Sequence, residues 1–290
     1  MNSLRRIMDI DTAGTSDIPL EQLRERLSAW LRARGPVAVG YSGGVDSAFL
    51  AVAARTTLGP AGVLAIIGRS PSYPVSQWET AREVAHRFDV QVLELDTEEL
   101  DDPRYAANPS NRCYYCKAEL WSKLVPLARA SGFATVIDGT NVDDLSDWRP
   151  GAQAAREHGV ASPLAELGFT KRHIRAASRL LGLPTWQQPS SPCLSSRLPY
   201  GIAVTRERLR QVERAEAALR ELGIAGDLRV RYHDDVARVE LGAAELTRWL
   251  DPARFAELRA SVVATGFERV ALDLRGFRSG SLNVLQGVTA

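Results

Sequence analysis

A glycine-rich turn at residues 40–47 constrains the chain more than any other feature. Its sequence, Gly-Tyr-Ser-Gly-Gly-Val-Asp-Ser, follows the apolar run 36–39 and precedes the small-residue run 48–54. This order predicts a strand, a tight turn and a helix start, which point backbone N–H groups and a positive helix-dipole end at one small volume. Glycines allow close approach of a ligand, serines add hydroxyl donors, and the aspartate can orient a metal ion. The candidate phosphate-binding residues are Ser42, Gly43, Gly44, Asp46 and Ser47.

The turn is not a Walker A loop, because that motif requires a lysine and residues 36–55 contain none. The string Ser-Gly-Gly-Val-Asp-Ser at residues 42–47 instead resembles the pyrophosphate loop (PP-loop) of the ATP pyrophosphatase superfamily. Members of that superfamily use ATP to adenylate a carbonyl or carboxylate oxygen and release pyrophosphate. The resemblance implies ATP and Mg²⁺ as cofactors. The alternative is an ordinary glycine-rich turn between a strand and a helix.

Composition limits the remaining possibilities. At 290 residues the chain is long enough for a large core and two domains. Its 36 basic and 35 acidic residues give a formal net charge of +1, which argues against a globally basic nucleic-acid-binding protein. The chain has no apolar run of membrane-spanning length and no signal-peptide core, so we expect a cytoplasmic protein without a membrane partner. Three cysteines do not suit a secreted disulfide scaffold.

Short apolar strands alternate with helical stretches between residues 36 and 183, which predicts an α/β fold with a doubly wound parallel sheet. A helix at 19–34 precedes the first strand, and residues 1–19 are expected to form a flexible N-terminus. Ligands bind at the carboxyl ends of such strands, where the PP-loop falls. The expected strands are Val37–Tyr41, Val63–Ile67, Val90–Leu95 and Thr135–Asp138, and the expected helices are Ala48–Thr57, Val75–Phe88, Lys117–Ala130 and Thr170–Leu181.

A loop rich in proline and serine, residues 187–197, follows the predicted sheet. Beyond it, a helix at 206–222, two strand-like runs, a helix at 251–265 and a last strand predict a small α+β module. We therefore divide the chain into a PP-loop ATP pyrophosphatase domain at 20–198 and a C-terminal substrate-binding and oligomerisation domain at 199–290.

The three cysteines form a pattern with several chemical readings. Cys113 and Cys116 make a C-x-x-C, and Cys193 lies in the proline- and serine-rich loop. Three thiolates can hold an iron–sulfur cluster with one open iron, whereas a structural zinc would need a histidine as fourth ligand. The C-x-x-C alone could be a redox dithiol, and all three cysteines could be small buried hydrophobic residues. The polar loop around Cys193 and the basic neighbours of the pair weaken the last reading.

A series of segments, in matching order along the chain, resembles the LarE-type ATP-dependent sulfur transferases, a branch of the PP-loop superfamily. The resemblance spans most of residues 20–285 and includes all three cysteines. Its segments are Tyr41–Ser47, Asn108-Pro109 with Arg112–Lys117, Asp138–Asp144, Asp147–Gly151, Ser162–Leu164, Pro192–Arg197 with Pro199–Gly201, and Gly276–Ser281.

The resemblance implies a role in making the nickel-pincer nucleotide, the cofactor found in lactate racemase. In that family, ATP adenylates a carboxylate of pyridinium-3,5-biscarboxylic acid mononucleotide, and a sulfur nucleophile displaces AMP to leave a thiocarboxylate. Two cycles give the bis-thiocarboxylate. The implied partners are this small molecule and sulfide or another sulfur donor. The family forms homo-oligomers through its C-terminal module.

The resemblance also assigns catalytic candidates. Cys193 is the expected sulfur site, because a thiolate attacks an acyl-adenylate readily. Arg197 is expected to stabilise the Cys193 thiolate or to hold a phosphate, and Ser196 lies beside it. Glu216, on the following helix, is a candidate to bind metal or orient substrate, with a surface position as its alternative.

Two further sets of residues complete the predicted site. Gly139, Thr140 and Asn141 end a strand and are expected to close over the nucleotide; the alternative is a turn with a capping asparagine. Arg229 and Arg231 alternate along a strand, so both point to one face and can grip the substrate's phosphate. Their alternative is a solvated strand face.

The cysteine count separates two kinds of family member. In sacrificial members a single cysteine gives up its sulfur and becomes dehydroalanine. Members with three cysteines are thought to hold a [4Fe–4S] cluster whose open iron carries an extra sulfide. The presence of Cys113, Cys116 and Cys193 favours the cluster version.

Three rival functions follow from the same sequence. A tRNA thiolation enzyme combines a PP-loop with three cysteines, but it usually carries an RNA-binding element with excess positive charge. An amide-forming synthetase of the NAD or GMP type shares the loop and needs no cysteine cluster. A non-enzymatic nucleotide sensor would bind ATP without releasing pyrophosphate.

Overall fold

The structure is a computed structural model that describes residues 18–145, 150–189 and 192–278. Several sequence predictions fall elsewhere in the chain. The expected flexible residues 1–17 and the resemblance segments at 147–149 and 279–281 lie outside the described residues. Within the described parts, no helix is both long enough and apolar enough to cross a membrane.

The first sheet has four parallel strands in the order β3-β2-β1-β4. Strands β1 and β2 lie in its centre and are almost entirely buried, which explains why both read as continuous apolar runs. The strand order reverses between β1 and β4, so the carboxyl ends of these two strands flank the crevice where ligands of such sheets bind. The strands are β1 (Val37–Gly40), β2 (Val63–Arg69), β3 (Gln91–Asp96) and β4 (Thr135–Ile137).

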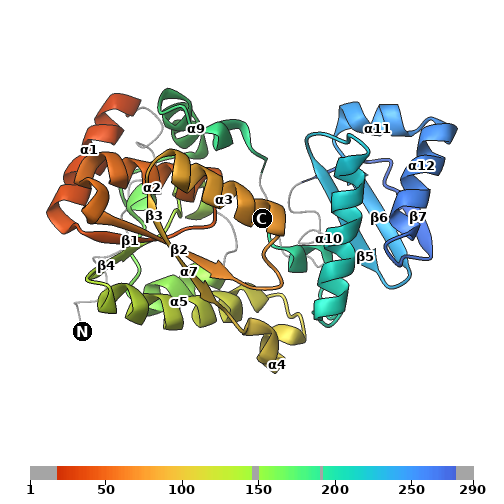
Figure 1. Ribbon diagram of the computed structural model, residues 1–290, viewed down its shortest axis with the longest axis horizontal. Coiled ribbons are helices and arrows are strands. Elements are labelled where there is room, and N and C mark those ends of the chain that lie inside the picture. The colour runs from red at the N-terminus through yellow and green to blue at the C-terminus, as the bar shows by residue number, and fades with distance from the viewer. Residues whose placement is uncertain (1–17, 146–149, 190–191, 279–290) are drawn as a thin grey trace, which may run out of the picture.

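Helices cover both faces of this sheet, as a doubly wound fold requires. Figure 1 shows α1, α2, α3 and α9 on one face and α5 and α7 on the other. These helices are α1 (Leu20–Arg34), α2 (Val45–Leu58), α3 (Val75–Arg87), α5 (Arg112–Ala130), α7 (Pro150–Glu157) and α9 (Lys171–Leu180). Shorter helical segments are η2 (Pro60–Gly62), η3 (Glu99–Asp101), α4 (Pro103–Ala106), α6 (Val142–Leu145), α8 (Pro163–Glu166), η4 (Pro184–Gln187) and η5 (Leu194–Arg197).

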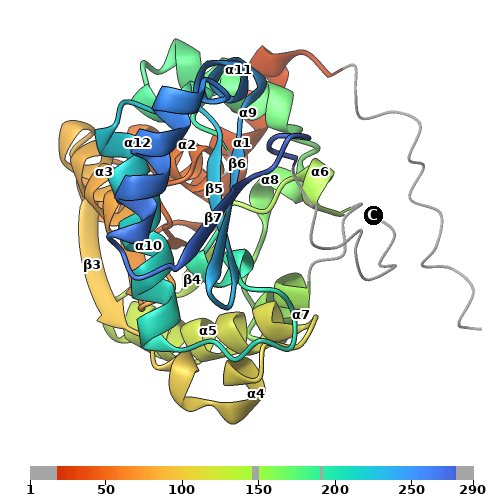
Figure 2. The same cartoon turned by 90° about the vertical axis from the view of Figure 1, so that its right-hand side faces the viewer.

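The second sheet is small and mixed. Strand β5 pairs antiparallel with β6, and β6 pairs parallel with β7. Helices α10 and α12 pack on one side of it, as Figure 2 shows. The elements are α10 (Arg206–Glu221), β5 (Leu228–His233), β6 (Val236–Leu241), α11 (Ala243–Trp249), α12 (Pro252–Val263) and β7 (Arg269–Leu272).

The core of this second part reaches back into the first. Tyr105, Leu194 and Leu198 are buried together with α10 and the second sheet. The proline- and serine-rich loop is therefore anchored in the C-terminal core, although it precedes that core in sequence. The domain boundary between residues 198 and 199 stays a prediction.

The α/β fold with a parallel sheet and a smaller C-terminal module is confirmed, and all four predicted strands of the first sheet lie within two residues of their observed bounds. Helix α5 differs, because it begins at Arg112 and not at Lys117. Cys113 and Cys116 therefore lie three residues apart on one face of its first turn. Helix α11 was not predicted at all, since its seven residues fall between a strand and the stronger α12 pattern.

Candidate active site

The PP-loop forms the turn that the sequence predicts. Ser47 Oγ accepts a hydrogen bond from Ser42 N at 3.2 Å and donates one to Gly44 O at 3.2 Å. Gly43 has φ +69°, and a Cβ there would lie 2.5 Å from Ala81 Cβ, so only glycine fits. The N-cap residue of α2 is Gly44, which has no side chain with which to cap the helix. The first N–H groups of α2 are thus arranged as an anion site at the carboxyl end of β1.

Helix α3 and the segment before it form hydrogen bonds to the backbone of the PP-loop. Ser42 O accepts hydrogen bonds from Tyr73 Oη at 2.9 Å and from Gln77 Nε2 at 2.8 Å. Tyr73 is partly buried, and burial followed by the charge of Glu94 raises its pKa, so it stays a donor at neutral pH. Neither residue was predicted, because both act on the loop from more than 30 positions away.

The segment after β4 lies directly against the PP-loop. A Cβ on Gly139 would be 2.9 Å from Ser47 N and 3.1 Å from the carbonyl carbon of Asp46. Asp138 fixes the turn, since its carboxylate accepts from Thr140 N at 3.1 Å and Thr140 Oγ1 at 2.9 Å. The structure therefore brings together the two segments that the sequence assigned to ATP.

Asn141 sits deeper than its neighbours. Its side chain is fully buried, donating to Asp144 Oδ2 at 2.8 Å and accepting from Asp143 N at 3.0 Å. These contacts are those of the capping asparagine that the sequence left open as an alternative. A direct contact between Asn141 and nucleotide stays a prediction.

Replacing Gly139 with alanine is expected to weaken ATP binding about tenfold or more, because the added methyl group must push the PP-loop backbone at Ser47. Titration calorimetry with Mg·ATP measures the change. Gly242→Ala is the matched control, since a Cβ there meets only ordinary contacts, the nearest at 3.7 Å. Equal ATP affinity in both variants would contradict the assignment of Gly139 to the nucleotide site.

The loop bearing Cys193 is tied to the same edge of the first sheet. Leu194 N donates to Ser72 O at 2.8 Å, and Ser195 Oγ lies 2.6 Å from Tyr105 Oη. Burial, and then the neighbouring Cys193, raise the pKa of Tyr105. Residues 190–191 of the loop lie outside the described residues.

Arg197 holds this loop together from within. It is 2% exposed and forms a two-pronged ion pair with Glu216, with both N–O distances at 2.9 Å. Its Nη1 donates to Pro192 O at 2.6 Å and to Cys193 O at 3.2 Å. Glu216 is therefore not a free surface group, and it also accepts from Val230 N at 3.0 Å on the edge of β5.

Arg229 and Arg231 are each only 6% exposed, so the solvated-face alternative is wrong for both. Arg231 donates to Ser196 O at 2.7 Å and pairs with Glu240 at 3.0 Å. Burial, and next the positive charge of Arg197, lower the pKa of Arg229 to about 10. Binding of an anion beside a buried arginine stabilises the charged form, which burial and neighbouring cations disfavour.

The three cysteines lie close enough to influence one another electrostatically. Cys113 is exposed, whereas Cys116 and Cys193 are partly buried. Burial, followed by the charge of Glu99, raises the pKa of Cys116 well above its usual value, and the other two thiols add to the effect. In the portions of the chain that the structure describes, no three His, Cys, Asp or Glu side chains are grouped to hold a metal ion.

A buried arginine stands beside these thiols. Arg112 is 4% exposed and donates to Asn108 Oδ1 at 2.6 Å. Burial alone would lower the pKa of Arg112, but the charges of Cys193 and Cys113 raise it above its usual value. Its guanidinium lies over the Tyr200 ring, 5.2 Å from the centroid. It places a fixed positive charge next to the sulfur atoms.

Comparison with known proteins decides the family. A family model described as NAD synthase matches residues 21–108, which include the PP-loop. The chain is 36% identical over 247 residues to the pyridinium-3,5-bisthiocarboxylic acid mononucleotide synthase of Lactiplantibacillus plantarum, covering 85% of this chain and 88% of that protein. The chain belongs to this LarE family of PP-loop enzymes. It is also 45% identical to an uncharacterised Synechocystis protein over 264 residues, 91% of this chain and 98% of the relative.

The chain is also similar to a more distant relative. GMP synthase of Aeropyrum pernix is 29% identical over 217 residues, 64% of this chain and 40% of that protein. The match to the Lactiplantibacillus plantarum synthase confirms the resemblance to the LarE family that the motifs predict, and the chain is an ATP-using enzyme of that family.

The LarE-family site also contains a cation that sequence reasoning missed. Lys171, the first residue of α9, forms an ion pair with Asp46 of the PP-loop. The two are 125 positions apart, and no motif around Lys171 signals the contact. Only the fold could reveal it.

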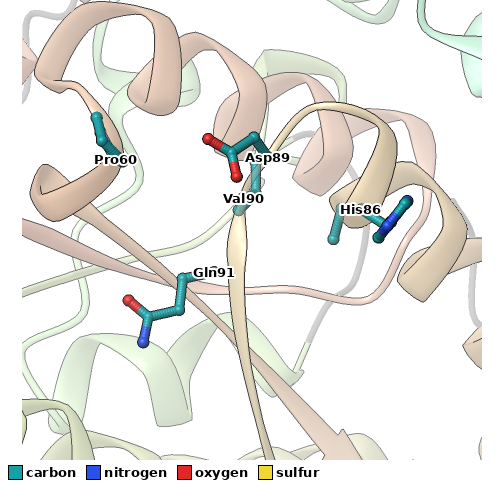
Figure 3. A pocket seen from close by; sticks show the side chains of 6 residues that line it. Pro60, His86, Asp89, Val90 and Gln91 are labelled. Carbon is teal, nitrogen blue, oxygen red and sulfur yellow. The ribbon is translucent and has the colours of Figure 1, made fainter.

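A cavity of about 410 Å³ lies elsewhere on this LarE-family fold. Figure 3 shows it between the C-terminal end of α3 and the start of β3, lined by residues that include His86, Asp89 and Gln91. This is the amino end of β3, whereas the PP-loop follows the carboxyl end of β1. The cavity therefore plays no part in the site described above.

Proposed function

We propose that the protein adenylates the carboxylates of pyridinium-3,5-biscarboxylic acid mononucleotide and converts them to thiocarboxylates, releasing AMP and pyrophosphate. One observation carries the proposal. The segment between β2 and α3 touches the PP-loop through Tyr73 and the Cys193 loop through Ser72. An acyl-adenylate formed over the PP-loop would therefore arise beside the loop that bears the sulfur nucleophile.

Adenylation is the work of the PP-loop. Its backbone N–H groups and the hydroxyls of Ser42 and Ser47 would bind the phosphates, and Mg²⁺ would neutralise their charge. A substrate carboxylate oxygen attacks the α-phosphorus, and the bond from that phosphorus to the pyrophosphate oxygen breaks. Gly139, which has no Cβ, lets the segment after β4 pack closely against the PP-loop at Ser47.

Sulfur transfer follows at the Cys193 loop. A sulfur nucleophile attacks the activated carbonyl, and AMP leaves with the electron pair of the acyl–oxygen bond. Arg229 would bind the substrate's phosphate, which would stabilise its buried charge. Arg231 and Arg197 would hold the Cys193 loop in place through Ser196 O and Glu216.

We propose that Cys113, Cys116 and Cys193 hold a [4Fe–4S] cluster in the active protein. Three thiols are the donor chemistry that such a cluster takes, so the residues fit the group. When bound, it would supply an open iron site for sulfide. The fixed charge of Arg112 would offset the negative charge gathered there. Ligation would require the three side chains to move toward one another, because the described residues contain no preformed ligand group.

The test is to incubate anaerobically purified protein with the pyridinium mononucleotide, ATP, Mg²⁺ and sulfide. Pyrophosphate and AMP should appear in equal amounts, and mass spectrometry should show replacement of carboxylate oxygen by sulfur. In a parallel incubation with ammonia in place of sulfide, an amide product would favour the synthetase alternative. In one with tRNA in place of the mononucleotide, thiolated tRNA would favour the tRNA enzyme. ATP binding without pyrophosphate release would favour a nucleotide sensor. We expect a homo-oligomer assembled through the C-terminal module, serving nickel-pincer cofactor biosynthesis.

A further inference from the structure

Arg112 is a buried arginine whose hydrogen-bond and ring partners within the described residues are neutral. Its side chain is 4% exposed, and Nη1 donates to Asn108 Oδ1 at 2.6 Å. Its guanidinium lies over the Tyr200 ring, and burial raises the pKa of that phenol, so Tyr200 carries no charge at neutral pH. Arg197 and Arg231 are buried to a similar extent, yet each pairs with a glutamate. A buried arginine without a carboxylate beside it is stabilised when an anion binds to it.

The Nε atom of Arg112 shows where such an anion would bind. Nε is buried and has no hydrogen-bond partner in the part of the chain that the structure describes. Because Nη1 is held by Asn108, the edge that remains is the one formed by Nε and Nη2. The N–H groups on that edge are parallel, which is the arrangement that binds both oxygens of a carboxylate. A buried donor without an acceptor is costly, so this edge indicates an anionic ligand.

The fold fixes this arginine beside the sulfur atoms. Arg112 is the first residue of α5, and Asn108 Nδ2 donates to two carbonyl groups of the turn at 199–202, each at 2.8 Å. The turn that follows the Cys193 loop is therefore fastened to the partner of Arg112. Against the lowering effect of burial, Cys193 and Cys113 raise the pKa of Arg112, so its charge lies within electrostatic reach of both sulfur atoms.

We propose that Arg112 binds the substrate carboxylate that is not being activated, and so selects a biscarboxylate over a monocarboxylate. This inference rests on the proposed function. The rigid pyridinium ring holds its two carboxylates at a fixed separation, so when one is activated beside Cys193 the other lies close by. A planar carboxylate matches the side-on edge of a guanidinium, whereas hydrosulfide offers a single acceptor atom. Binding displaces the atoms that cover Nε and desolvates the carboxylate, which strengthens the pair.

The test compares two probes by titration calorimetry without ATP. One is pyridinium-3,5-biscarboxylic acid mononucleotide, and the other is its analogue with a carboxylate at position 3 only. The unaltered protein should bind the biscarboxylate about tenfold or more tightly, and Arg112→Met should bind both probes about as the unaltered protein binds the monocarboxylate. A change that only disturbs packing would weaken both probes and leave their ratio unchanged, which would overturn the inference.

Two further variants sharpen the comparison. Arg112→Lys keeps the charge but has no parallel pair of donors, so it should recover only part of the preference for the biscarboxylate. Arg104→Met is the matched control. The Arg104 guanidinium also lies over a ring, that of Tyr115, but its side chain is exposed and pairs with Asp102, so the change should alter neither affinity. Loss of the preference in Arg104→Met as well would overturn the inference.

Iron content and turnover separate this inference from the proposals on which it rests. If Arg112→Met loses iron but retains the preference for the biscarboxylate, Arg112 acts only on the thiols and the inference is overturned. Unaltered protein stripped of iron by a chelator is titrated in parallel, and loss of the preference there would assign it to the cluster, with the same result. If the preference depends on Arg112 but the unaltered protein forms no AMP, the proposed reaction fails and the role of Arg112 stands. If the unaltered protein shows no preference, the inference fails.

Discussion

Replacing Cys193 with alanine should abolish thiocarboxylate formation, a loss of about 10³-fold or more, because it removes the proposed sulfur site. Substrate-dependent pyrophosphate release in the first turnover should persist, because the proposed adenylation site is built from the PP-loop and Gly139 and does not use the Cys193 thiol. The measurement pairs a pyrophosphate assay with mass spectrometry of the small-molecule product. Sulfur transfer at an unchanged rate would remove Cys193 from the mechanism.

Cys113→Ala distinguishes the two sulfur sources. If three thiolates hold a cluster, anaerobically purified protein should contain about four iron and about four acid-labile sulfide per chain, and Cys113→Ala should lose both the iron and sulfur transfer. If Cys193 is a sacrificial donor, Cys113→Ala should transfer sulfur normally. In that case the spent protein should have lost the mass of one H₂S from Cys193. Intact iron and transfer in Cys113→Ala would exclude the cluster proposal.

The sequence predicts those parts of the fold and site that depend on local pattern. Strands β1 and β2 are continuous apolar runs because helices cover both their faces, and the turn after β1 carries its own glycines and serines. The start of α5 was misplaced because the C-x-x-C was read as a motif and not as the first helical turn. The local sequence pattern therefore predicts the PP-loop but not the position of the cysteines in the first turn of α5.

Contacts between residues that are far apart in the chain leave no comparable signal in the sequence. Lys171 reaches Asp46 across 125 positions, and Glu216 looked like an isolated helical carboxylate until Arg197 was seen to be buried against it. Arg229 and Arg231 were assigned to one strand face by their alternation. Arg231 contacts Ser196 O and Arg229 lies over the Phe277 ring, and the alternation does not encode these contacts.

Arg197→Met should lower the free energy of unfolding by about 3–5 kcal/mol, because it leaves the Glu216 carboxylate without its cation and two loop carbonyl groups without their arginine donor. Urea denaturation measures the loss, provided that the m-value, the dependence of the unfolding free energy on urea concentration, is unchanged. Arg210→Met is the matched control, an exposed arginine on α10 that should change stability by no more than about 0.5 kcal/mol.

The double variant Arg197→Met with Glu216→Leu separates the contribution of the ion pair to stability from that of the hydrogen bonds to the loop carbonyl groups. If the ion pair dominates, the double variant should be less destabilised than the sum of the two single changes, since no uncompensated charge stays buried. It should still be less stable than the unaltered protein, because Pro192 O and Cys193 O lose a donor that leucine and methionine cannot replace. Strict additivity would mean that Arg197 and Glu216 stabilise the loop independently. If the double variant is less destabilised than the sum of the single variants, the two residues act as one structural unit that holds the Cys193 loop in place.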